Sequence, residues 1–327
     1  MPHFRSYEKV RNAMKRFAIM MALLATIVGE RVVVMAWNVE NFFDFKNDGV
    51  SASEAEFSAT GARRWSKRRF YTKCNAIAKT ILWAGTPDVV VLEEVENAFV
   101  LRQLLTQTAL RKLDYRIIHY DSPDPRGIDV AMLYRSSRLE LLESHPVRVA
   151  TQDTSFRTRD ILVACFRSAE GDSIGIMGCH LPSKYGGGES DWKRMAVTAK
   201  ITAICDTLKA NGYDGYLAIG DFNDTPENGA FDALPLTLLP KPSDGGSIRF
   251  NGLWQLIDLA FASPAVAGKC HFRVLRPPFL TTRDATHSGE KPLRTYVGPR
   301  YVGGVSDHCP ILVEIGDMDR FHSGFLP

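Results

Sequence analysis

Short runs of almost entirely apolar residues recur between residues 31 and 316, and each run adjoins a polar or charged residue. Two Val-rich runs occupy residues 31–36 and 88–92, and similar runs follow at 173–179, 216–219 and 309–315. A strand without a polar face is buried on both sides, so its sheet needs another layer above and below. The chain therefore has to fold in layers, with sheets packed between helices.

Helix-like segments separate several of these strands. Residues 64–82 carry an apolar stripe at helical spacing, and residues 98–110 and 192–208 are predicted as two further helices. We expect additional strands at residues 129–134, 161–166 and 256–262. Alternation of strands and helices predicts an α/β protein, and the consecutive strands around 161–180 indicate antiparallel hairpins as well.

The composition is that of an ordinary globular protein. Of the 327 residues, 45% are apolar and 24% are charged, and the formal net charge is +3. These values exclude a disordered, collagen-like or disulfide-dense chain. Because no Pro/Ser-rich linker divides the chain, we predict a single catalytic domain at 31–316, followed by a tail at 317–327. Gly- and Pro-rich stretches at 239–249 and 276–304 are predicted as long loops.

The N-terminal segment, residues 1–30, resembles a secretory signal. Lys15 and Arg16 precede a 12-residue apolar stretch from Phe17 to Val28, which is shorter than the roughly 20 residues that span a bilayer. We therefore expect an exported protein, periplasmic or secreted, without a stable membrane span. The alternative is an N-terminal hydrophobic helix packed on a cytoplasmic domain. We also expect a monomer.

The six cysteines are too far apart in the sequence to form a metal or redox motif. They are Cys74, Cys165, Cys179, Cys205, Cys270 and Cys309. No C-x-x-C pair occurs among them. Since most of them lie among apolar neighbours, we interpret them as buried free thiols, although an even number in an exported protein leaves disulfides open.

Polar side chains with catalytic potential cluster at the ends of the predicted strands. They are Asn38, Glu94, His180, Asp221, Asn223, Asp258, Asp307 and His308. If the strand ends meet at one edge of the sheets, the carboxylates gathered there repel one another unless a cation lies between them. Carboxylate and amide oxygens are ligands that Mg²⁺ or Mn²⁺ prefers. The pattern thus predicts a divalent-metal site.

Each of these motifs is weak alone, but their ordered set resembles the endonuclease/exonuclease/phosphatase superfamily. The matching segments are WNVEN, LEEVEN, GCHLPSK, GDFND, LIDLAFAS and GVSDHCP, which run from residue 37 to residue 310. The superfamily includes deoxyribonucleases, apurinic endonucleases, sphingomyelinases and inositol-polyphosphate phosphatases. Segments at 124–135, 158–162 and 292–308 are similar to a bacterial nuclease-like branch.

The resemblance implies a fold and a mechanism. The fold is a four-layer α/β sandwich, in which two mixed, mainly antiparallel sheets pack face to face with helices outside. The mechanism is metal-assisted hydrolysis of a phosphoester by water. Carried over by motif, Glu94 is the principal metal ligand, with Asn38 and Asp307 beside it.

The resemblance also assigns the catalytic groups. Asp221 orients or deprotonates the attacking water, and Asn223 holds that water or a phosphate oxygen. His308 contacts the phosphate and is oriented by Asp258, while His180 donates to the phosphate oxygens from the other side. A positively charged imidazole offsets charge that builds up on the phosphate. The alternative for Asp258 is a plain strand residue, because LIDLAF also fits an ordinary strand.

Several basic residues are candidates for contact with phosphate. Arg159 precedes a predicted strand, and the resemblance implies a phosphate contact for it, because nucleases of this family have an arginine at a similar place. Arg126, Lys184 and Arg294 are weaker candidates, and structural or solvated residues are the alternative for all four. Residues 57–87 contain seven basic residues, interleaved aromatic residues and no acidic residue. Such a segment fits a nucleic-acid backbone. It equally fits a solvated helix face, or a partner for the acidic segment 38–56.

Three functions remain open at this point. A Mg²⁺-dependent nuclease acting on nucleic acid is the leading hypothesis, with a sphingomyelinase-like or small-molecule phosphoesterase as the alternative. A catalytically inactive exported binding protein is the third. A dinucleotide-binding fold is disfavoured, because no G-x-G-x-x-G opens a helix. The segment GDSIG at 171–175 fits G-x-S-x-G, but its serine begins the predicted strand 173–179 instead of lying at a turn from a strand into a helix, so a serine hydrolase is disfavoured as well.

Overall fold

The computed structural model describes residues 31–316, apart from residues 47, 50, 185–190, 228 and 241–244. Within it, Val32–Ile315 form one compact unit. The predicted signal at 1–30 and the tail at 317–327 lie outside the described residues. Among the described residues, every helix is too short or too polar to cross a membrane.

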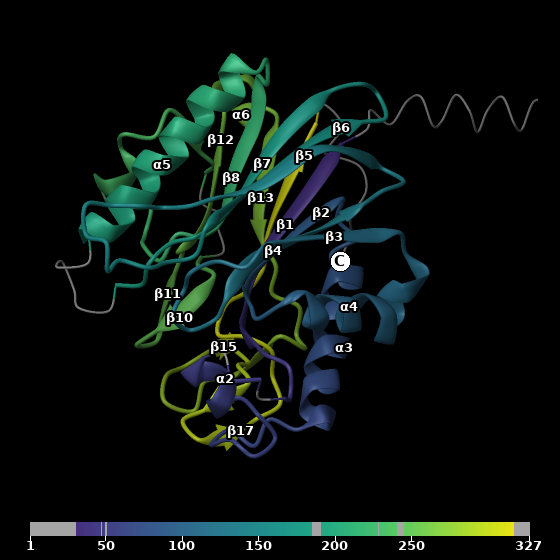
Figure 1. The fold of residues 1–327 in the computed structure, drawn as a ribbon. Helices are drawn as coiled ribbons and strands as arrows, with labels where there is room; N and C mark the ends of the chain where they lie inside the picture. Colours follow the sequence, from purple (N-terminus) through teal and green to yellow (C-terminus); the bar gives the residue numbers. More distant parts are fainter. Residues whose placement is uncertain are drawn as a thin grey trace, which may run out of the picture. The chain divides into compact units, whose positions relative to one another are not determined.

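Two six-stranded sheets form the centre of the molecule (Figure 1). The first has the order β13 (Cys270–Val274), β18 (Ile311–Ile315), β1 (Val32–Phe42), β2 (Val89–Val95), β4 (Asp129–Arg135) and β3 (Tyr115–His119). The second has the order β5 (Leu139–Val147), β6 (Ile161–Ser168), β7 (Ser173–His180), β8 (Gly215–Asp221), β12 (Asp258–Ala262) and β9 (Thr237–Leu238). Both sheets are mixed and mainly antiparallel, as predicted.

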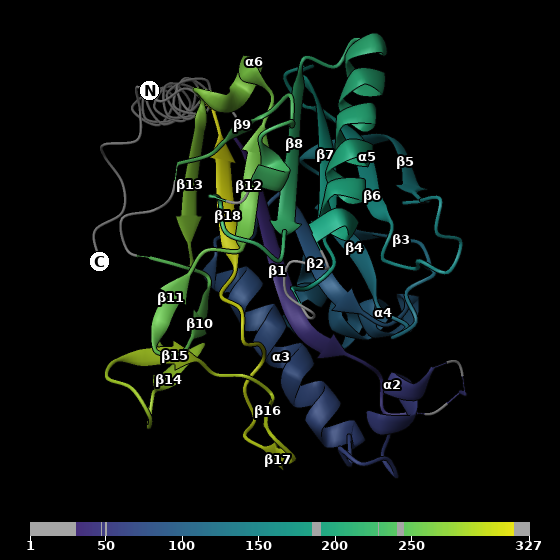
Figure 2. The same cartoon turned by 90° about the vertical axis from the view of Figure 1, so that its left-hand side faces the viewer.

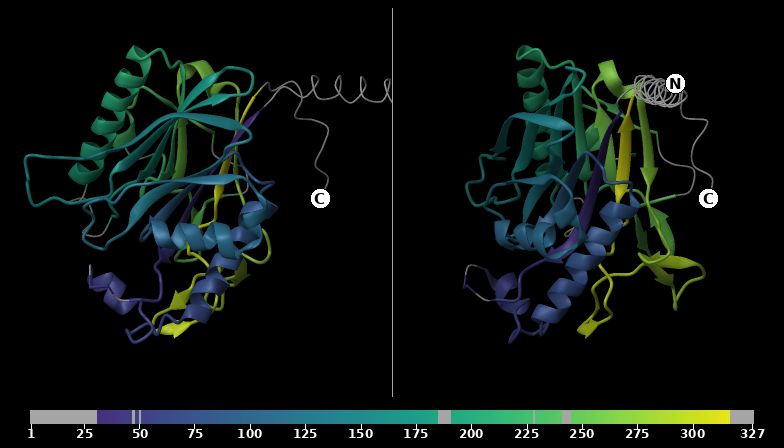
Figure 3. Two further views of the ribbon diagram at one scale, coloured as in Figure 1. Left: turned by 45° about the vertical axis from the view of Figure 1, so that its right-hand side comes forward. Right: turned by 90° about the vertical axis from the view of Figure 1, so that its right-hand side faces the viewer.

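Helices cover the outer faces of the two sheets (Figure 2). The helices α3 (Lys67–Trp83) and α4 (Ala98–Gln107) lie against the first sheet, and α5 (Asp191–Ala210) lies against the second. The short helices are α2 (Ala52–Glu56), α6 (Pro264–Ala267) and the 3₁₀ turns η1 (Ala109–Lys112) and η3 (Gly229–Phe231). The predicted four-layer α/β sandwich is confirmed, as the further views in Figure 3 also show.

Alternate residues of β1 belong to different cores, which explains why this strand has no polar face. Val34 and Ala36 pack in the core between the two sheets, whereas Met35 and Trp37 pack in the core beneath α3 and α4. Since successive side chains of a strand point to opposite faces, both faces of the first sheet are buried. The apolar run at 31–36 predicted this burial.

Each sheet contains one parallel pair of strands, and these pairs determine where the site forms. The strands β1 and β2 run parallel in the first sheet, and β7 and β8 run parallel in the second. Asn38 and Glu94 lie toward the ends of the first pair, while His180 and Asp221 end the second. The antiparallel β12 begins at Asp258, directly opposite Asp221. Strand ends and strand starts therefore supply side chains to the same edge.

Left-handed backbone interrupts the strand ends of the first sheet. Glu40 and Asn41 have φ angles of 50° and 52°, and Glu94 has a φ of 62°. The pairing register shifts at the same places, between Asn38 and Phe42 and between Glu93 and Val95. Such irregularities cost backbone energy and re-aim side chains, and they are common beside active sites. Here they turn Glu40 and Glu94 toward the candidate site.

Three short hairpins lie within or directly after the two segments predicted as long loops. They comprise β10 (Ile248–Phe250) with β11 (Leu253–Gln255), β14 (Thr281–Arg283) with β15 (Glu290–Pro292), and β16 (Tyr296–Val297) with β17 (Arg300–Tyr301). Strands of two or three residues are too short to show an alternating pattern in the sequence. The sequence also missed the edge strands β3, β5 and β13. All six cysteines are buried and free.

The close approach of the two sheets depends on Gly178 in β7. A β-carbon there would lie 2.9 Å from a methyl group of Val91 and 3.0 Å from one of Val130. We expect Gly178→Val to lower the free energy of unfolding by about 1–3 kcal/mol through overpacking. Gly268 has open space around it, so Gly268→Ala is the control and should change stability little. Urea denaturation measures both, and an unchanged midpoint for Gly178→Val would contradict this view of the interface.

Candidate active site

A cavity of about 290 Å³ lies where the strand ends of the two sheets meet. Of the predicted catalytic and metal-binding residues, all but Asp258 line it. They are Asn38, Glu94, His180, Asp221, Asn223, Asp307 and His308. Arg126, Arg159 and Arg294 line it as well. The structure thus brings together side chains that are up to 270 positions apart in the sequence.

His308 is held between two carboxylates at the back of the cavity. Its Nδ1 lies 2.9 Å from an oxygen of Asp258, and its Nε2 lies 3.8 Å from an oxygen of Asp221. Burial by itself lowers the pKa of His308, but Asp258 and then Asp221 raise that pKa well above its usual value. His308 is therefore an imidazolium at neutral pH, with Asp258 fixing its orientation from behind.

Asp221 occupies the centre of the site and is 1% exposed. The Asn38 amide donates to it at 3.1 Å, and the backbone N–H of Asn223 donates at 2.8 Å. Burial raises the pKa of Asp221 to about 7, although His308 and these two donors act in the opposite direction. A carboxyl group with such a pKa takes up and releases a proton near neutral pH.

His180 approaches Asp221 from the neighbouring strand. Its Nε2 is 3.6 Å from an oxygen of Asp221, and its buried Nδ1 has no hydrogen-bond partner among the described residues. Burial lowers the pKa of His180 well below its usual value, and the positive charges of Arg159 and Arg126 lower it further. His180 is therefore neutral, in contrast to His308, and one of its ring nitrogens carries a hydrogen that can be donated.

Carboxylates and arginines alternate along the open side of the cavity. Arg126 contacts Glu94 at 3.1 Å. Arg294 bridges Glu40 at 2.7 Å and Asp307 at 3.0 Å. The burial of Glu40 raises its pKa, with Asp307 adding to the effect and Lys73 and Arg294 opposing it. Three acidic side chains thus face one small space, and two arginines balance part of their charge.

Two of the predicted phosphate-binding residues are tied into the protein. The Arg159 guanidinium contacts Asp124 at 2.9 Å and donates to the carbonyl oxygen of Leu181 at 2.8 Å, while remaining at the cavity wall. Lys184 pairs with Asp224 and does not line the cavity. Arg126 and Arg294 line the cavity, but they also serve as counter-ions to its acids.

Sequence reasoning missed two acidic residues of this region. Glu40 lines the cavity, and the signal in the sequence was an acidic residue two positions after Asn38. Glu93 is fully buried, and neither of its carboxyl oxygens has a hydrogen-bond partner among the described residues. Burial raises the pKa of Glu93 well above its usual value, with Asp258 and Asp221 adding to the rise, so the group is neutral. Its signal was the paired acids of LEEVEN.

The basic segment 57–87 is used largely inside the molecule. Arg63 pairs with Glu56 at 2.7 Å, Arg69 lies over the ring of Tyr301, and Lys79 lies over that of Phe279. Lys73 is buried and donates to the carbonyl oxygen of Glu40 and the hydroxyl of Thr295. The exposed cations of the segment that remain are Arg64, Lys67 and Arg68.

The acidic side chains around the cavity have the chemistry that a hard divalent cation requires. Glu94, Asp307 and Glu40 offer carboxylate oxygens, and Asn38 offers an amide oxygen. Asp221, Asp258 and His308 also bring ligand atoms within 4.8 Å of one another. Because His308 is already held between Asp221 and Asp258, we interpret that second group as a site for proton transfer and the first as the one that fits a cation.

Comparison with known proteins gives a family and a fold. The sequence model of a family described as "Endonuclease/Exonuclease/phosphatase family" matches residues 33–317. A sequence search of curated proteins gave no match.

Three solved structures illustrate the likeness, each with a TM-score of 0.57. The human Nocturnin catalytic domain is 18% identical, and the alignment covers 88% of this chain and 96% of that one. Truncated TDP2 of Caenorhabditis elegans is 16% identical, with 87% and 97% covered. A mannosyl-6-phosphatase of Bacteroides thetaiotaomicron is 16% identical, with 87% and 99% covered. At such identities these structures establish the fold alone.

The protonation of His308 can be tested without any substrate. Because the Asp258 carboxylate raises the pKa of His308, Asp258→Asn should lower that pKa. An NMR titration of the His308 ring in the metal-free protein measures the change. Asp121→Asn removes an exposed carboxylate outside the cavity and is the matched control. An unchanged His308 titration in Asp258→Asn would contradict the proposed pairing.

Proposed function

The chain belongs to the endonuclease/exonuclease/phosphatase family, and we propose that it is a divalent-metal-dependent phosphoesterase that cleaves a phosphodiester by attack of water. One observation carries the proposal. A buried row of Asp221, His308 and Asp258 opens onto a cavity lined by further carboxylates and arginines. This combination supplies a base, an imidazolium, ligands for a cation and cationic groups for a phosphate.

Glu94 is the residue that we propose as the main metal ligand, with Asn38, Asp307 and Glu40 nearby. A cation held there supplies Lewis-acid stabilisation of the negative charge that builds on the phosphate oxygens. Left-handed backbone at Glu94 and Glu40 supports this assignment, because strained conformations persist where a side chain has to be aimed. Arg126 and Arg294 limit the repulsion among these acids.

Asp221 is the proposed base for the attacking water. Its raised pKa suits proton uptake near neutral pH. The Asn223 NH₂ group donates to the carbonyl oxygen of Leu181 at 2.8 Å, and this bond fixes the amide. The amide oxygen of Asn223 is then the atom that accepts a hydrogen bond from the same water. Asp221 is the last residue of β8 and Asn223 follows two residues later, so the end of one strand positions both the base and the amide that holds the water.

The two histidines are proposed to take different parts in the reaction. His308, as an imidazolium, donates to a phosphate oxygen and offsets charge in the transition state. Its pairing with Asp258 keeps it charged and correctly oriented. His180, which is neutral, donates one hydrogen bond from the opposite wall. Arg159 at the same wall adds a fixed positive charge.

Nucleic acid is the leading substrate class, and a small phosphorylated molecule is the second candidate. The second candidate is favoured because most cations of the segment 57–87 contact protein groups, which leaves fewer of them to bind a nucleic-acid backbone. These cations are Arg63, Arg69, Lys73 and Lys79. The second candidate is also compatible with the phosphatase among the structural neighbours. We further propose that residues 31–316 act as a single domain and that the protein is exported as a monomer.

The metal dependence can be tested with bis(p-nitrophenyl) phosphate. We expect hydrolysis in Mg²⁺ or Mn²⁺ that stops on addition of chelator. Glu94→Gln should lower kcat/KM by about 100-fold or more, because an electrostatic contact to the transition state is lost. Glu140→Gln, an exposed change on β5 at a residue that pairs with Arg167 and lies outside the cavity lining, is the control. Metal-independent hydrolysis would contradict the mechanism, and inertness with every metal would favour the inactive binding protein.

A substrate panel then separates the substrate classes. Plasmid DNA, RNA, sphingomyelin and sugar phosphates are incubated with the metal-loaded protein, and products are followed by electrophoresis and phosphate release. We expect cleavage of DNA or RNA, and Asp221→Asn should abolish it because the base is lost. If sugar phosphates are hydrolysed and neither nucleic acid is cleaved, the second candidate replaces the first.

A further inference from the structure

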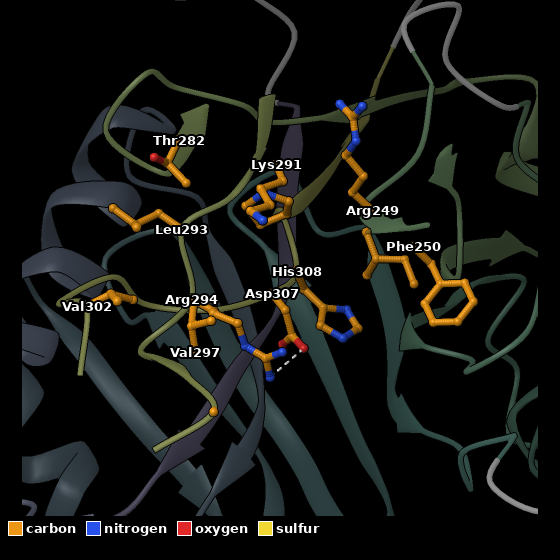
Figure 4. A pocket seen from close by; sticks show the side chains of 13 residues that line it. Arg249, Phe250, Thr282, Lys291, Leu293, Arg294, Val297, Val302, Asp307 and His308 are labelled. Carbon is orange, nitrogen blue, oxygen red and sulfur yellow. Dashed lines mark ion pairs between the residues drawn. The ribbon is translucent and has the colours of Figure 1, made fainter. Parts of the chain in front are cut away.

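A second hollow, of about 360 Å³, adjoins the candidate active site (Figure 4). The two cavities share Arg294, Asp307 and His308. Its other lining residues come from β10 and from the hairpin region between residues 282 and 302. Because the shared residues border both spaces, a molecule whose phosphate occupies the active site can extend directly into this hollow. Its volume lies within the range of about 300–1,000 Å³ that is typical of ligand pockets.

Apolar side chains form the two facing walls of the hollow. Phe250 stands on one side, and Leu293, Val297 and Val302 stand on the other, with Asp307 and His308 between them (Figure 4). Phe250 is 60% exposed and Val297 is 50% exposed. An aromatic face that is left open beside a reaction centre is suited to stacking with a planar group.

The basic side chains of the hollow are already held by contacts with the protein. Arg249 lies 3.7 Å from Asp284 and donates to backbone carbonyl oxygens, and its guanidinium points away from His308 (Figure 4). Lys291 contacts the same Asp284 at 3.1 Å. Arg294 is shared between Glu40 and Asp307. Since these contacts hold the basic groups and the exposed apolar side chains are left open, the hollow suits an uncharged group.

We propose that this hollow binds a flat, uncharged ring of the molecule whose phosphate occupies the active site, either the aryl group of an aryl phosphate ester or a nucleobase whose sugar is esterified to the phosphate. The proposal rests on the proposed function, because the phosphate is the part of the ligand that the active site holds. Phe250 is the specificity-determining residue, and it recognises the ring by stacking. His308 lies at the junction, so the ring and the phosphate are recognised on either side of it.

Two phosphonates test the subsite because they differ only in the group attached to phosphorus. Isothermal titration calorimetry in Mg²⁺ should show phenylphosphonate binding at least about fivefold more tightly than methylphosphonate. Phe250→Ala should remove this preference by weakening phenylphosphonate alone. Val297→Trp should do the same by filling the hollow. Leu253→Ala is the control, because Leu253 is on the same hairpin, is 69% exposed and does not line the hollow.

Equal affinity of the wild type for the two phosphonates would overturn the proposal. So would a phenyl preference that survives both Phe250→Ala and Val297→Trp. Hydrolysis of bis(p-nitrophenyl) phosphate by the same preparations reports the proposed function separately. Hydrolysis without a phenyl preference shows that the subsite alone is wrong. A phenyl preference that Phe250→Ala removes, in a protein without hydrolysis, supports the ring subsite and contradicts the enzyme.

Discussion

Acidic side chains crowded between two sheets are the constraint on which the rest of this structure depends. Glu93, Asp221 and Asp258 are almost completely buried within one small region. Like charges repel strongly in such an interior, because little water screens them. The protein avoids the repulsion in two ways: Glu93 stays neutral, and the imidazolium of His308 lies between Asp221 and Asp258. The raised pKa of Asp221 and the positive charge of His308, which suit catalysis, both result from this arrangement of buried acids.

The cations that support the site come from segments far away in the sequence. Arg294 joins Glu40 to Asp307, and Lys73 binds the backbone of Glu40 and the hydroxyl of Thr295. Burial lowers the pKa of Lys73 to about 8, partly offset by the charges of Glu40 and Glu94. The basic segment thus fastens the irregular end of β1 to the segment that carries Arg294. The positive charges of the segment 57–87 therefore stabilise the fold, in addition to any contact that they make with a ligand.

Strand ends were predictable from the sequence, whereas strand irregularities were not. The apolar runs identified β1, β2, β7 and β8, and the polar residues beside these runs are the ones that line the cavity. Nothing local in the sequence signals left-handed backbone at Glu40 and Glu94, since neither residue is glycine. The pairing of Arg126 with Glu94 also depends on three-dimensional contact alone.

The residues proposed for catalysis and the residues proposed for ligand recognition lie on different kinds of element. The candidate catalytic residues sit on the strands of the two sheets or within three residues of a strand end, so their positions follow from the packing of the sheets. Phe250 and Val297, in contrast, lie on hairpins of two or three residues per strand, Val297 inside the predicted loop 276–304 and Phe250 directly after the predicted loop 239–249. Such hairpins can change in length and composition without disturbing either sheet. A chain of this fold can therefore alter what it recognises while its reacting groups stay in place.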